Sequence, residues 1–420
     1  MGIPPNNEDQ AALTLREGAE AVVRRLRQAG HQAVFAGGCV RDALLGRVPK
    51  DYDIATDAVP ETVIGCFERT IPIGLQFGVI QVHHGEHTYE VATFRTEGGY
   101  QDGRRPETVQ WANAQADVAR RDFTINGLLY DPVDDVVLDY VEGRSDLAAG
   151  LIRAIGDPTE RFGEDHLRIL RAVRFSARFG FRIEAVTWQA MQTLAHTVPK
   201  VSPERIHHEL ERILTEGQAD VGLTLLEDSG LRAHVLPELT QPSQAVARLA
   251  VVDQVSPAVG WALALYDIGA SGDVAASVEA LGRRLRFSRE VIKRATAAIA
   301  GARLIADYTG LTGAARKRLL RASGVQDLMA VATAVSAAGQ SDGEGLRAAE
   351  TDRARWSAED LAPRPLLDGG ALRKAGYRPG PGFKTALVAI EDAQLEGRAN
   401  DEAEAWLIAR RVLELDQDSP

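Results

Sequence analysis

Residues 37–56 read GGCVRDALLGRVPKDYDIAT, and the first five letters predict a phosphate-binding turn. The pair Gly37-Gly38 lets backbone N–H groups approach phosphate oxygens closely, because glycine carries no side chain. Arg41 follows three residues later and can hold the same oxygens with its forked guanidinium. The stretch before the glycines fits a short strand, and the apolar residues after them fit a helix. We therefore expect a strand–turn–helix unit that binds phosphate groups.

The same stretch ends in Asp51-Tyr52-Asp53, two acidic residues separated by one position. Side chains alternate along a strand, so a strand over residues 51–54 places both carboxylates on one face. Neighbouring carboxylates repel each other unless a cation lies between them, and Mg²⁺ prefers oxygen ligands of this kind. Together with the phosphate turn, the pair favours metal-assisted phosphoryl transfer, in which a hydroxyl displaces pyrophosphate from a nucleoside triphosphate.

Length and composition indicate a large globular protein. The chain has 420 residues, too many for one ordinary core, and 45 % of them are apolar and 25 % charged. It contains no apolar run long enough to cross a membrane, and its polar start lacks the apolar core of a signal peptide. The two cysteines, Cys39 and Cys66, form neither a disulfide framework nor a zinc pattern. We therefore expect a cytoplasmic protein without a membrane partner.

The net charge of −11 is unusual for a protein that binds nucleic acid, because phosphates attract a basic surface. A local basic cluster is sufficient, however, since a phosphate backbone responds to nearby potential more than to total charge. Three such clusters are present, at residues 161–182, 283–294 and 315–321. Charge alone leaves nucleic-acid binding and solvated helix faces as open alternatives.

Hydrophobic periodicity divides the chain into a mixed α/β part that ends near residue 150 and an almost wholly helical part after Gly156. In the first part we expect helices over residues 11–29, 40–46 and 60–70, and strands over residues 31–36, 52–56, 77–84 and 88–95. In the second part, Ser202-Pro203 is typical of a helix start, and that helix should reach about Leu214. Breaks rich in glycine and proline occur at residues 237–242 and 376–382.

A second motif, ARRDFTINGLLYD at residues 119–131, combines two arginines and an aspartate with an apolar run. We expect Arg120, Arg121 and Asp122 to begin a helix that packs against the mixed α/β part. On its own, such a triplet is more often a surface salt-bridge group than a ligand clamp.

A third motif, RFGEDHLRILRAVRFSARFGFR at residues 161–182, carries arginines at helical spacing. Four of them recur every three or four residues and so line one stripe of a helix: Arg168, Arg171, Arg174 and Arg178. A solvated basic face is the simplest explanation of an isolated stripe of this kind. Asp165 precedes Arg168 by three residues, however, which places a hydrogen-bond acceptor beside a donor fork.

This acceptor and donor suit two of the four nucleobases. Cytosine and adenine present an amine beside a ring-nitrogen acceptor, so Asp165 can accept from the amine while Arg168 donates to the nitrogen. Uracil and guanine present the reverse order and would leave buried groups unpaired, at a cost of about 1–3 kcal/mol each. The pair therefore predicts the use of CTP and ATP and the rejection of UTP and GTP.

In this order, the motifs resemble the DNA polymerase β nucleotidyltransferase superfamily and, within it, the class II tRNA nucleotidyltransferases and bacterial poly(A) polymerases. Further blocks similar to that family lie at residues 73–82, 94–109, 202–214 and, more weakly, 372–383. The resemblance implies an α+β fold, in which a mixed α/β nucleotidyltransferase head with a small β-sheet precedes an all-helical neck, body and tail. We expect the head at residues 20–150, the neck at 151–215, the body at 216–300 and the tail at 301–420.

The resemblance also implies roles for individual residues. Asp51 and Asp53 would bind Mg²⁺ and be catalytic, and Glu90 would be either a third catalytic carboxylate or an exposed strand glutamate. The block Glu164-Asp165-His166-Leu167-Arg168 matches the family's protein template for the base. The nucleotide-binding residues implied are Gly37, Gly38, Arg41, Arg121, Asp165, Arg168, Arg171 and Arg174. Most relatives carry alanine at the position of Gly127, a small departure that leaves the role of its motif intact.

The function that follows is addition of C and A to the 3′ end of tRNA, from CTP and ATP, without a nucleic-acid template. The implied partner is tRNA, held along its acceptor and T arms by a monomer or weak dimer. The 94–109 segment matches a mobile loop that the family needs for adding A, which disfavours CC-only addition. A-only addition and poly(A) synthesis remain alternatives, as does a non-catalytic RNA-binding protein that retains the fold. The acidic C-terminus lacks the basic extension of poly(A) polymerases that resemble this family.

Overall fold

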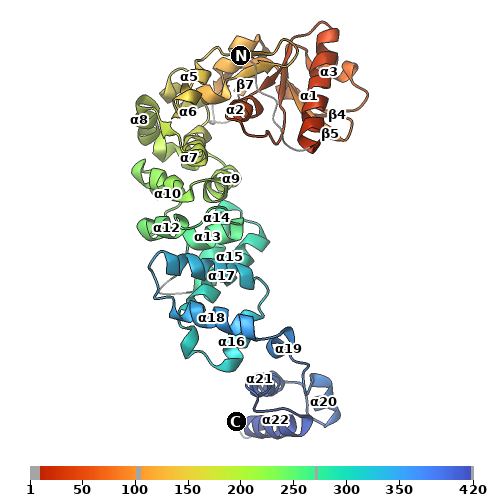
Figure 1. The fold of residues 1–420 in the computed structure, drawn as a ribbon, viewed down its shortest axis with the longest axis vertical. Helices are drawn as coiled ribbons and strands as arrows, with labels where there is room; N and C mark the ends of the chain where they lie inside the picture. The colour runs from red at the N-terminus through yellow and green to blue at the C-terminus, as the bar shows by residue number, and fades with distance from the viewer. Residues whose placement is uncertain (1–9, 101–105, 270–272, 418–420) are drawn as a thin grey trace. The chain divides into compact units, whose positions relative to one another are not determined.

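The computed structural model describes residues 10–100, 106–269 and 273–417, and the chain divides into two compact units. The first unit ends at Pro237 and the second begins at Glu238. All the strands belong to the first unit, and the described residues of the second are helical (Figure 1). A mixed sheet with helices followed by a largely helical part confirms the predicted α+β class. The finer division into head, neck, body and tail stays a prediction.

A seven-stranded sheet forms the centre of the first unit, in the order β3-β4-β5-β2-β1-β8-β9. Its strands are β1 Ala33–Ala36, β2 Ile54–Thr56, β3 Thr70–Gly74, β4 Val79–His84, β5 His87–Thr93, β8 Leu129–Asp131 and β9 Val136–Leu138. Strands β2 and β5 run parallel, and the other neighbours are antiparallel. The order brings the glycine turn after β1, the aspartates before β2 and the middle of β5 to adjacent positions.

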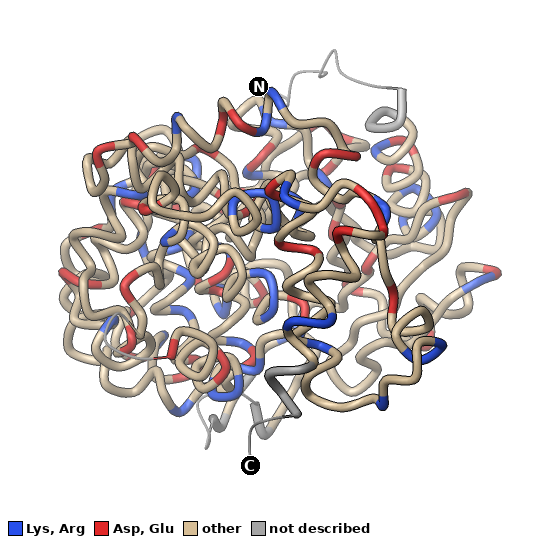
Figure 2. The backbone as a smooth tube through the Cα atoms, turned by 90° about the horizontal axis from the view of Figure 1, so that it is seen from below, with Lys and Arg blue, Asp and Glu red and all other residues tan. Residues whose placement is uncertain are grey.

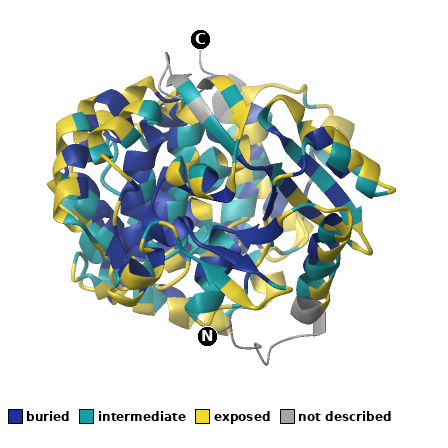
Figure 3. Ribbon diagram, turned by 90° about the horizontal axis from the view of Figure 1, so that it is seen from above, coloured by how far each residue is buried: buried dark blue, intermediate teal, exposed yellow. Residues whose placement is uncertain are grey.

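Helices pack on both faces of this sheet. On one face, α1 (Gln10–Gln28) and α3 (Pro60–Cys66) contact β5 and its neighbours. Tyr89 of β5 points to this face, since its hydroxyl donates to the carbonyl of Leu15 at 2.9 Å. On the other face, Val118 of α4 (Ala114–Ala119) shares an apolar cluster with Val34, Ala55 and Leu129. Buried positions alternate with more exposed ones along β4 and β5 (Figure 3).

The strand after the acidic pair begins later than the sequence predicts. β2 starts at Ile54, so Asp51 and Asp53 precede the strand and do not belong to it. The ladder extends one residue further, because the N–H of Ala36 donates to the Asp53 carbonyl at 2.9 Å. Beyond that point Gly37 turns the partner strand away, and residues 51 and 52 have no β1 residue opposite them.

The prediction that the second motif begins a helix is wrong. α4 ends at Ala119, a single 3₁₀ turn spans Thr124–Asn126, and the apolar run forms strand β8. The reason is long-range, since β1 supplies a pairing partner in which Phe35 lies opposite Tyr130. An apolar run of this length fits a strand or a helix equally well until such a partner is known.

Gly127 follows the 3₁₀ turn in a space too small for a side chain. A methyl group there would lie 2.7 Å from Cγ2 of Val141, 3.0 Å from Cγ1 of Val118 and 3.2 Å from Cδ1 of Ile155. The φ angle of Gly127, −86°, is ordinary, so crowding and not backbone conformation selects glycine. Neighbouring side chains occupy the volume that alanine would need.

Residues 94–109, which the resemblance marks as a mobile loop, contain most of a β-hairpin. β6 (Arg95–Tyr100) pairs with β7 (Pro106–Trp111), and residues 101–105 lie outside the described residues. The base of the hairpin is fixed to the sheet, because Arg95 donates to the carbonyl of Phe77 and the ring of Trp111 covers Gly78. The mobility of the segment stays a prediction.

The remainder of the first unit is helical apart from one short parallel pair, β10 Leu151–Ile152 and β11 Arg182–Ile183. Its helices are α2 Gly38–Leu44, α5 Gly143–Ala148, α6 Pro158–Glu164, α7 Leu167–Phe179, α8 Ala185–Leu194, α9 Pro203–Thr215, α10 Ala219–Asp228 and α11 Leu231–Val235. α7 and α9 pack against each other. α9 begins after Ser202 as predicted, although the Ser202 side chain makes no capping hydrogen bond.

The described residues of the second unit form short helices joined by turns. They are α12 Pro242–Leu249, α13 Pro257–Ala264, α14 Val274–Leu285, α15 Arg289–Ala306, α16 Gly313–Leu320, α17 Val325–Ala337, α18 Glu344–Arg355, α19 Ala358–Leu361, α20 Gly369–Lys374, α21 Pro381–Leu395 and α22 Glu402–Gln417. The last three share an apolar cluster that includes Leu372, Ile390 and Ala409. Among all described helices, none is both long and apolar enough to cross a membrane.

Candidate active site

The predicted phosphate turn requires glycine at its first position. Gly37 leads from β1 into α2 with a φ of 72°, a conformation that residues with side chains rarely adopt. A methyl group on Gly37 would also lie 3.0 Å from Nη1 of Arg121. The turn is held by the Gly37 N–H, which donates to the carbonyl of Leu128 at 3.0 Å. The structure therefore brings Arg121 against Gly37, while its predicted nucleotide contact stays a prediction.

Asp53 lies where its negative charge is unfavourable. Desolvation, assisted by the charges of Asp51 and Glu90 and opposed by that of Arg121, raises the pKa of its carboxyl to about 6. The side chain still reaches solvent, so the protein surrounds this carboxylate without enclosing it. A carboxylate whose pKa is raised by burial and by neighbouring negative charges attracts a divalent cation.

Glu90 lies beside Asp53 on the sheet. β2 and β5 run parallel with Ile54 opposite Val91, so the residues before them, Asp53 and Glu90, are neighbours across the two strands. Glu90 is exposed and points to the face opposite its buried neighbours Tyr89 and Val91. Within the described residues, no three His, Cys, Asp or Glu side chains are already arranged as a metal site.

Asp117 connects the two arginines of the second motif. Its buried carboxylate accepts from Arg120 at 2.7 Å and from Arg121 at 3.0 Å. Burial raises the pKa of Asp117, but the two guanidinium charges outweigh it and hold the pKa below its usual value. The sequence contained a readable signal for Asp117, its spacing of three and four residues from the arginines, which our sequence reasoning missed.

Arg41 is buried beside the turn, and its Nη2 lies 3.7 Å from the position that a methyl group on Gly38 would take. It is 4 % exposed, donates to Asp42 at 2.7 Å and to Oδ1 of Asn126 at 2.5 Å, and stacks on Phe179 with 4.6 Å to the ring centroid. Protein partners therefore engage its guanidinium in this structure. Its predicted phosphate contact stays a prediction.

The arginine stripe of α7 is not a solvated helix face. Arg168 is 9 % exposed and Arg174 is 2 % exposed, while Arg171 and Arg178 are half-buried. Burial lowers the pKa of Arg174 to about 10, against the opposing charge of Glu209, and its Nη1 has no hydrogen-bond partner. A surface-charge explanation of the stripe is therefore excluded by its burial.

Asp165 and Arg168, predicted to lie side by side, are each held by a different partner. Asp165 lies between α6 and α7, and its carboxylate accepts from Arg205 at 2.8 and 3.2 Å. Arg168 donates to Glu164 at 2.7 Å and to the carbonyl of Arg120 at 2.9 Å. The acceptor and the donor are thus supported separately and do not form an ion pair with each other.

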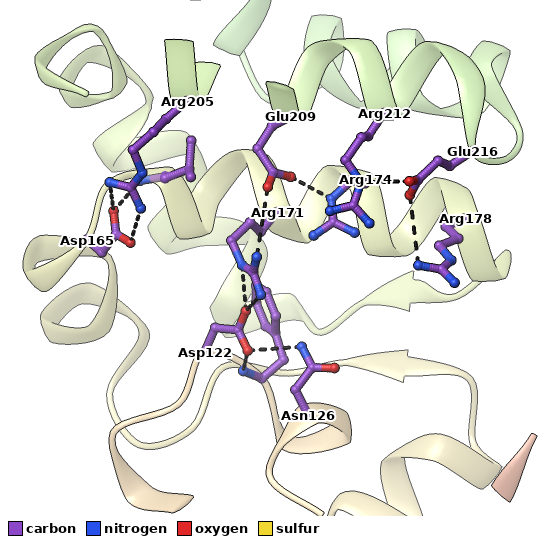
Figure 4. A network of polar contacts seen from close by, with 12 residues as sticks. Asp122, Asn126, Asp165, Arg171, Arg174, Arg178, Arg205, Glu209, Arg212 and Glu216 are labelled. Carbon is purple, nitrogen blue, oxygen red and sulfur yellow. Dashed lines mark hydrogen bonds and ion pairs between the residues drawn. The ribbon is translucent and has the colours of Figure 1, made fainter. Parts of the chain in front are cut away.

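Two of the opposite charges for this region come from Glu209 of α9 and from Glu216, the residue that follows α9 (Figure 4). Glu209 accepts from Arg174 at 2.6 Å and lies 3.8 Å from Arg171. Glu216 pairs with Arg212 at 2.7 Å and lies 3.8 Å from Arg178. Sequence reasoning predicted the helix but missed these partners. The available signal was a stripe of alternating charge at helical spacing: Arg205, Glu209, Arg212 and Glu216.

Asp122 joins the arginine stripe to the sheet side of the unit. Its carboxylate pairs with Arg171 at 2.7 Å and accepts from Nδ2 of Asn126 at 3.0 Å (Figure 4). Burial alone would raise the pKa of Asp122, yet Arg171, with the Asn126 hydrogen bond, lowers it to about 2. Asn126 also binds Arg41, so one polar network connects the turn helix with α7 and α9.

The three basic clusters differ in exposure. Lys and Arg are interspersed with Asp and Glu along the chain (Figure 2). In the 283–294 cluster, Arg283, Arg289 and Lys293 are exposed, whereas the 161–182 cluster is largely buried. In the 315–321 cluster, Arg318 pairs with Glu391 and Asp392. The 283–294 cluster is therefore the most exposed of the three.

A mixed sheet with a glycine turn, an acidic pair and an arginine against the turn defines a nucleotidyltransferase head of the polymerase β type. Comparison with known families agrees. Residues 33–153 match the model of the poly A polymerase head domain. Residues 180–241 match the model described as the probable RNA and SrmB-binding site of polymerase A.

Comparison with individual relatives identifies the family within this class. The CCA-adding enzyme of Limosilactobacillus fermentum is 36 % identical over 392 residues, covering 92 % of this chain and 94 % of the relative. That of Latilactobacillus sakei is 34 % identical, covering 94 % and 98 %. The crystal structure of the Bacillus stearothermophilus CCA-adding enzyme in complex with CTP matches with a TM-score of 0.78 at 29 % identity, covering 96 % and 99 %. The chain belongs to the class II CCA-adding enzyme family, which confirms the resemblance seen in its motifs. It is a tRNA nucleotidyltransferase of the CCA-adding type.

Proposed function

We propose that the enzyme adds C, C and A to the 3′ end of tRNA from CTP and ATP and releases pyrophosphate. The observation that carries this proposal is the hydrogen bond from Nη2 of Arg168 to the carbonyl of Arg120, at 2.9 Å. It places the proposed base-reading arginine next to Arg121, which lies against Gly37. A nucleotide with its phosphates at the glycine turn then has its base beside α7.

Base selection is assigned to Asp165 and Arg168. A carboxylate offers about four lone-pair sites, so Asp165 can keep Arg205 and still accept from the exocyclic amine of cytosine or adenine. Arg168 donates to the ring nitrogen of the same base. Uracil and guanine would place their carbonyl acceptor against the Asp165 carboxylate and their N–H donor against the Arg168 guanidinium, so they are rejected. Arg171 and Arg174 support the nucleotide from the following turns of α7.

Asp51 and Asp53 fit a divalent cation, because burial and the nearby charges of Asp51 and Glu90 raise the pKa of Asp53, and a bound cation would offset both effects. Bound Mg²⁺ would offset triphosphate charge and favour ionisation of the primer hydroxyl. Gly37, Gly38 and Arg121 hold the triphosphate. The primer 3′-oxygen forms a bond to the α-phosphorus, and the bond from that phosphorus to pyrophosphate breaks. Glu90 accepts the hydroxyl hydrogen bond and orients the attacking oxygen.

The proposed RNA substrate is tRNA, contacted along its acceptor and T arms by shape and through its backbone. The exposed basic residues at 283–294 suit phosphate contacts, which predicts binding that weakens as salt rises. We place the enzyme in the cytoplasm, acting as a monomer or weak dimer. Its two cysteines are free, which is compatible with a reducing compartment.

The test uses purified protein, Mg²⁺, all four nucleoside triphosphates, and tRNA transcripts that end either before CCA or after CC. Sequencing of the products should show C, C and A on the first transcript and one A on the second, with no further addition. Asp53→Asn serves as the catalytically inactive control.

Three other outcomes contradict the proposal in different ways. Addition of A to the second transcript alone would indicate an A-adding enzyme. A long run of A would indicate a poly(A) polymerase. A folded protein that binds tRNA and adds nothing would indicate an inactive RNA-binding relative.

A further inference from the structure

A row of residues crosses strands β3, β4 and β5 and ends at Asp53, just before β2, among the proposed catalytic carboxylates. Ile71 of β3 lies opposite Gln81 of β4, and Gln81 lies opposite Glu90 of β5. Asp53 follows in the same row, since the next residues along, Ile54 and Val91, are paired. Residues opposite each other in neighbouring strands share a face of the sheet. The side chains of Ile71, Gln81, Glu90 and Asp53 therefore lie on one side.

This side is opposite to the one that α1 and α3 cover. Tyr89, which neighbours Glu90 along β5, is buried and bonded to α1, whereas Glu90 is exposed. Gln81 is half-buried between the fully buried Ile80 and Val82. Ile71 at the outer end of the row is 44 % exposed. Along the row, the side chains thus change from charged (Asp53 and Glu90) through polar (Gln81) to apolar (Ile71), and a ligand can reach each of them.

The order of the strands determines which substrate meets this row. From one edge inward, the sheet carries Ile71, Gln81 and Glu90, then the acidic pair before β2, then the glycine turn after β1. In phosphoryl transfer, the attacking and leaving oxygens lie roughly in line on opposite sides of the phosphorus. A triphosphate held at the glycine turn has its leaving pyrophosphate on the β1 side. The attacking hydroxyl must then approach from the β5 side.

We infer that Gln81 and Ile71 form the binding site for the 3′-terminal nucleotides of the RNA acceptor. This inference rests on the proposed function and adds the position of its second substrate. The Gln81 amide both donates and accepts, so it can bind a ribose hydroxyl or a phosphate oxygen. Ile71 packs against the sugar or base of the preceding nucleotide. Three strand spacings separate Ile71 from Asp53, about 14 Å, which leaves room for both nucleotides.

The test compares Gln81→Ala and Ile71→Asp with Val136→Asp as a matched control. Val136 is 45 % exposed and lies on β9, the opposite edge strand of the same sheet. KM is measured separately for tRNA ending in CC and for ATP, together with the melting temperature. Gln81→Ala should raise KM for the tRNA about five- to tenfold, the effect of one lost hydrogen bond. Ile71→Asp should raise it at least about tenfold, because it also repels phosphate.

In both variants, KM for ATP should stay within about twofold of the wild-type value, and the melting temperature should stay within about one degree. Val136→Asp should change neither KM for tRNA nor KM for ATP. Wild-type KM for tRNA in both variants would overturn the inference while the proposed function stands. A parallel rise in KM for ATP would also overturn it, since that outcome indicates a general disturbance of the site. Failure of the wild-type enzyme to add any nucleotide would instead refute the proposed function.

Discussion

The guanidinium of Arg205 donates to both oxygens of Asp165, at 2.8 and 3.2 Å, from a helix that begins nearly 40 residues later in the chain. The carboxylate that we propose to read the base amine is therefore oriented by α9. Arg205 acts through Asp165 and is a positioning residue. Arg168 is oriented independently, by Glu164 and by the carbonyl of Arg120.

Arg205→Ala should loosen base selection. Freed from its partner, Asp165 samples more rotamers, so KM for CTP and for ATP should rise together by about three- to tenfold, and UTP incorporation should increase. Arg205→Lys should recover part of the loss, because it keeps a donor without the fork. Arg24→Ala removes an exposed pair with Glu20 and should change none of these values. Unchanged UTP rejection in Arg205→Ala would show that α9 does not orient Asp165.

Asp165→Ala and Arg168→Ala should change nucleotide incorporation in different ways. The first removes the repulsion against the carbonyl of uracil, so discrimination should fall by about ten- to a hundredfold in a folded protein. The second removes the donor that both accepted bases use, so CTP and ATP incorporation should fall together. Arg168→Ala should also melt at a lower temperature, since it removes the hydrogen bonds from Arg168 to Glu164 and to the part-buried carbonyl of Arg120. Measuring the incorporation of all four nucleotides by each variant checks both expectations. A stable Asp165→Ala variant that still rejects UTP would contradict base selection by Asp165 and Arg168.

Asp53→Asn should abolish nucleotide addition and yet stabilise the metal-free protein at neutral pH. The folded-state pKa of Asp53 is about 6, above the value of about 3.9 in an unfolded chain. The folded protein therefore binds this proton more tightly, and its stability falls as pH rises from about 4 to 6. At pH 7.5 without divalent cations, the variant should melt above wild type, and at pH 4 the two should coincide. Adding Mg²⁺ should raise the wild-type melting temperature only; equal melting at pH 7.5 would count against this environment of Asp53.

Asp122→Asn should destabilise the first unit at neutral pH. The pKa of Asp122 is lowered to about 2, so its ionised form adds stability above about pH 3.9 that is lost as pH falls toward 2. The difference corresponds to about 2–3 kcal/mol at pH 7. Urea unfolding should show the same difference in unfolding free energy between wild type and Asp122→Asn down to about pH 5, and a smaller difference below pH 4. Asp134→Asn, which breaks an exposed pair with Arg27, should cost less than about 1 kcal/mol. Equal costs for the two variants would show that the Asp122 network adds no stability.

The sequence was sufficient to predict those elements that are determined by residues close together in the chain. The helix of Arg168 and Arg174, the strand before Gly37 and the start of α9 at Pro203 follow from periodicity and turn residues, and the structure has them. Burial of the arginines was not readable in the same way, because an arginine stripe looks identical on a solvated face. It becomes visible once the partner Glu209 is known, and that residue lies on another helix.

Long-range pairing also explains the two local errors. The segment after Asp122 was expected to be a helix, but β1 offers Leu129 and Tyr130 a strand to pair with. Asp51 was expected in a strand, but β1 turns away at Gly37 before it can pair there. The burial of Arg41 has the same origin, since its partner Asn126 comes from a distant part of the sequence.

The filled space around Gly127 makes the order of mutations matter in this lineage. A methyl group introduced alone meets Val118, Val141 and Ile155 at 2.7–3.2 Å, so Gly127→Ala is unfavourable in this background. Shortening Val141 first removes the closest of these contacts, so the same change then costs less. A glycine version and an alanine version of the motif therefore each suit a different set of neighbours. A chimera that imports residues 119–131 from an alanine-bearing relative must import the neighbours of that alanine as well.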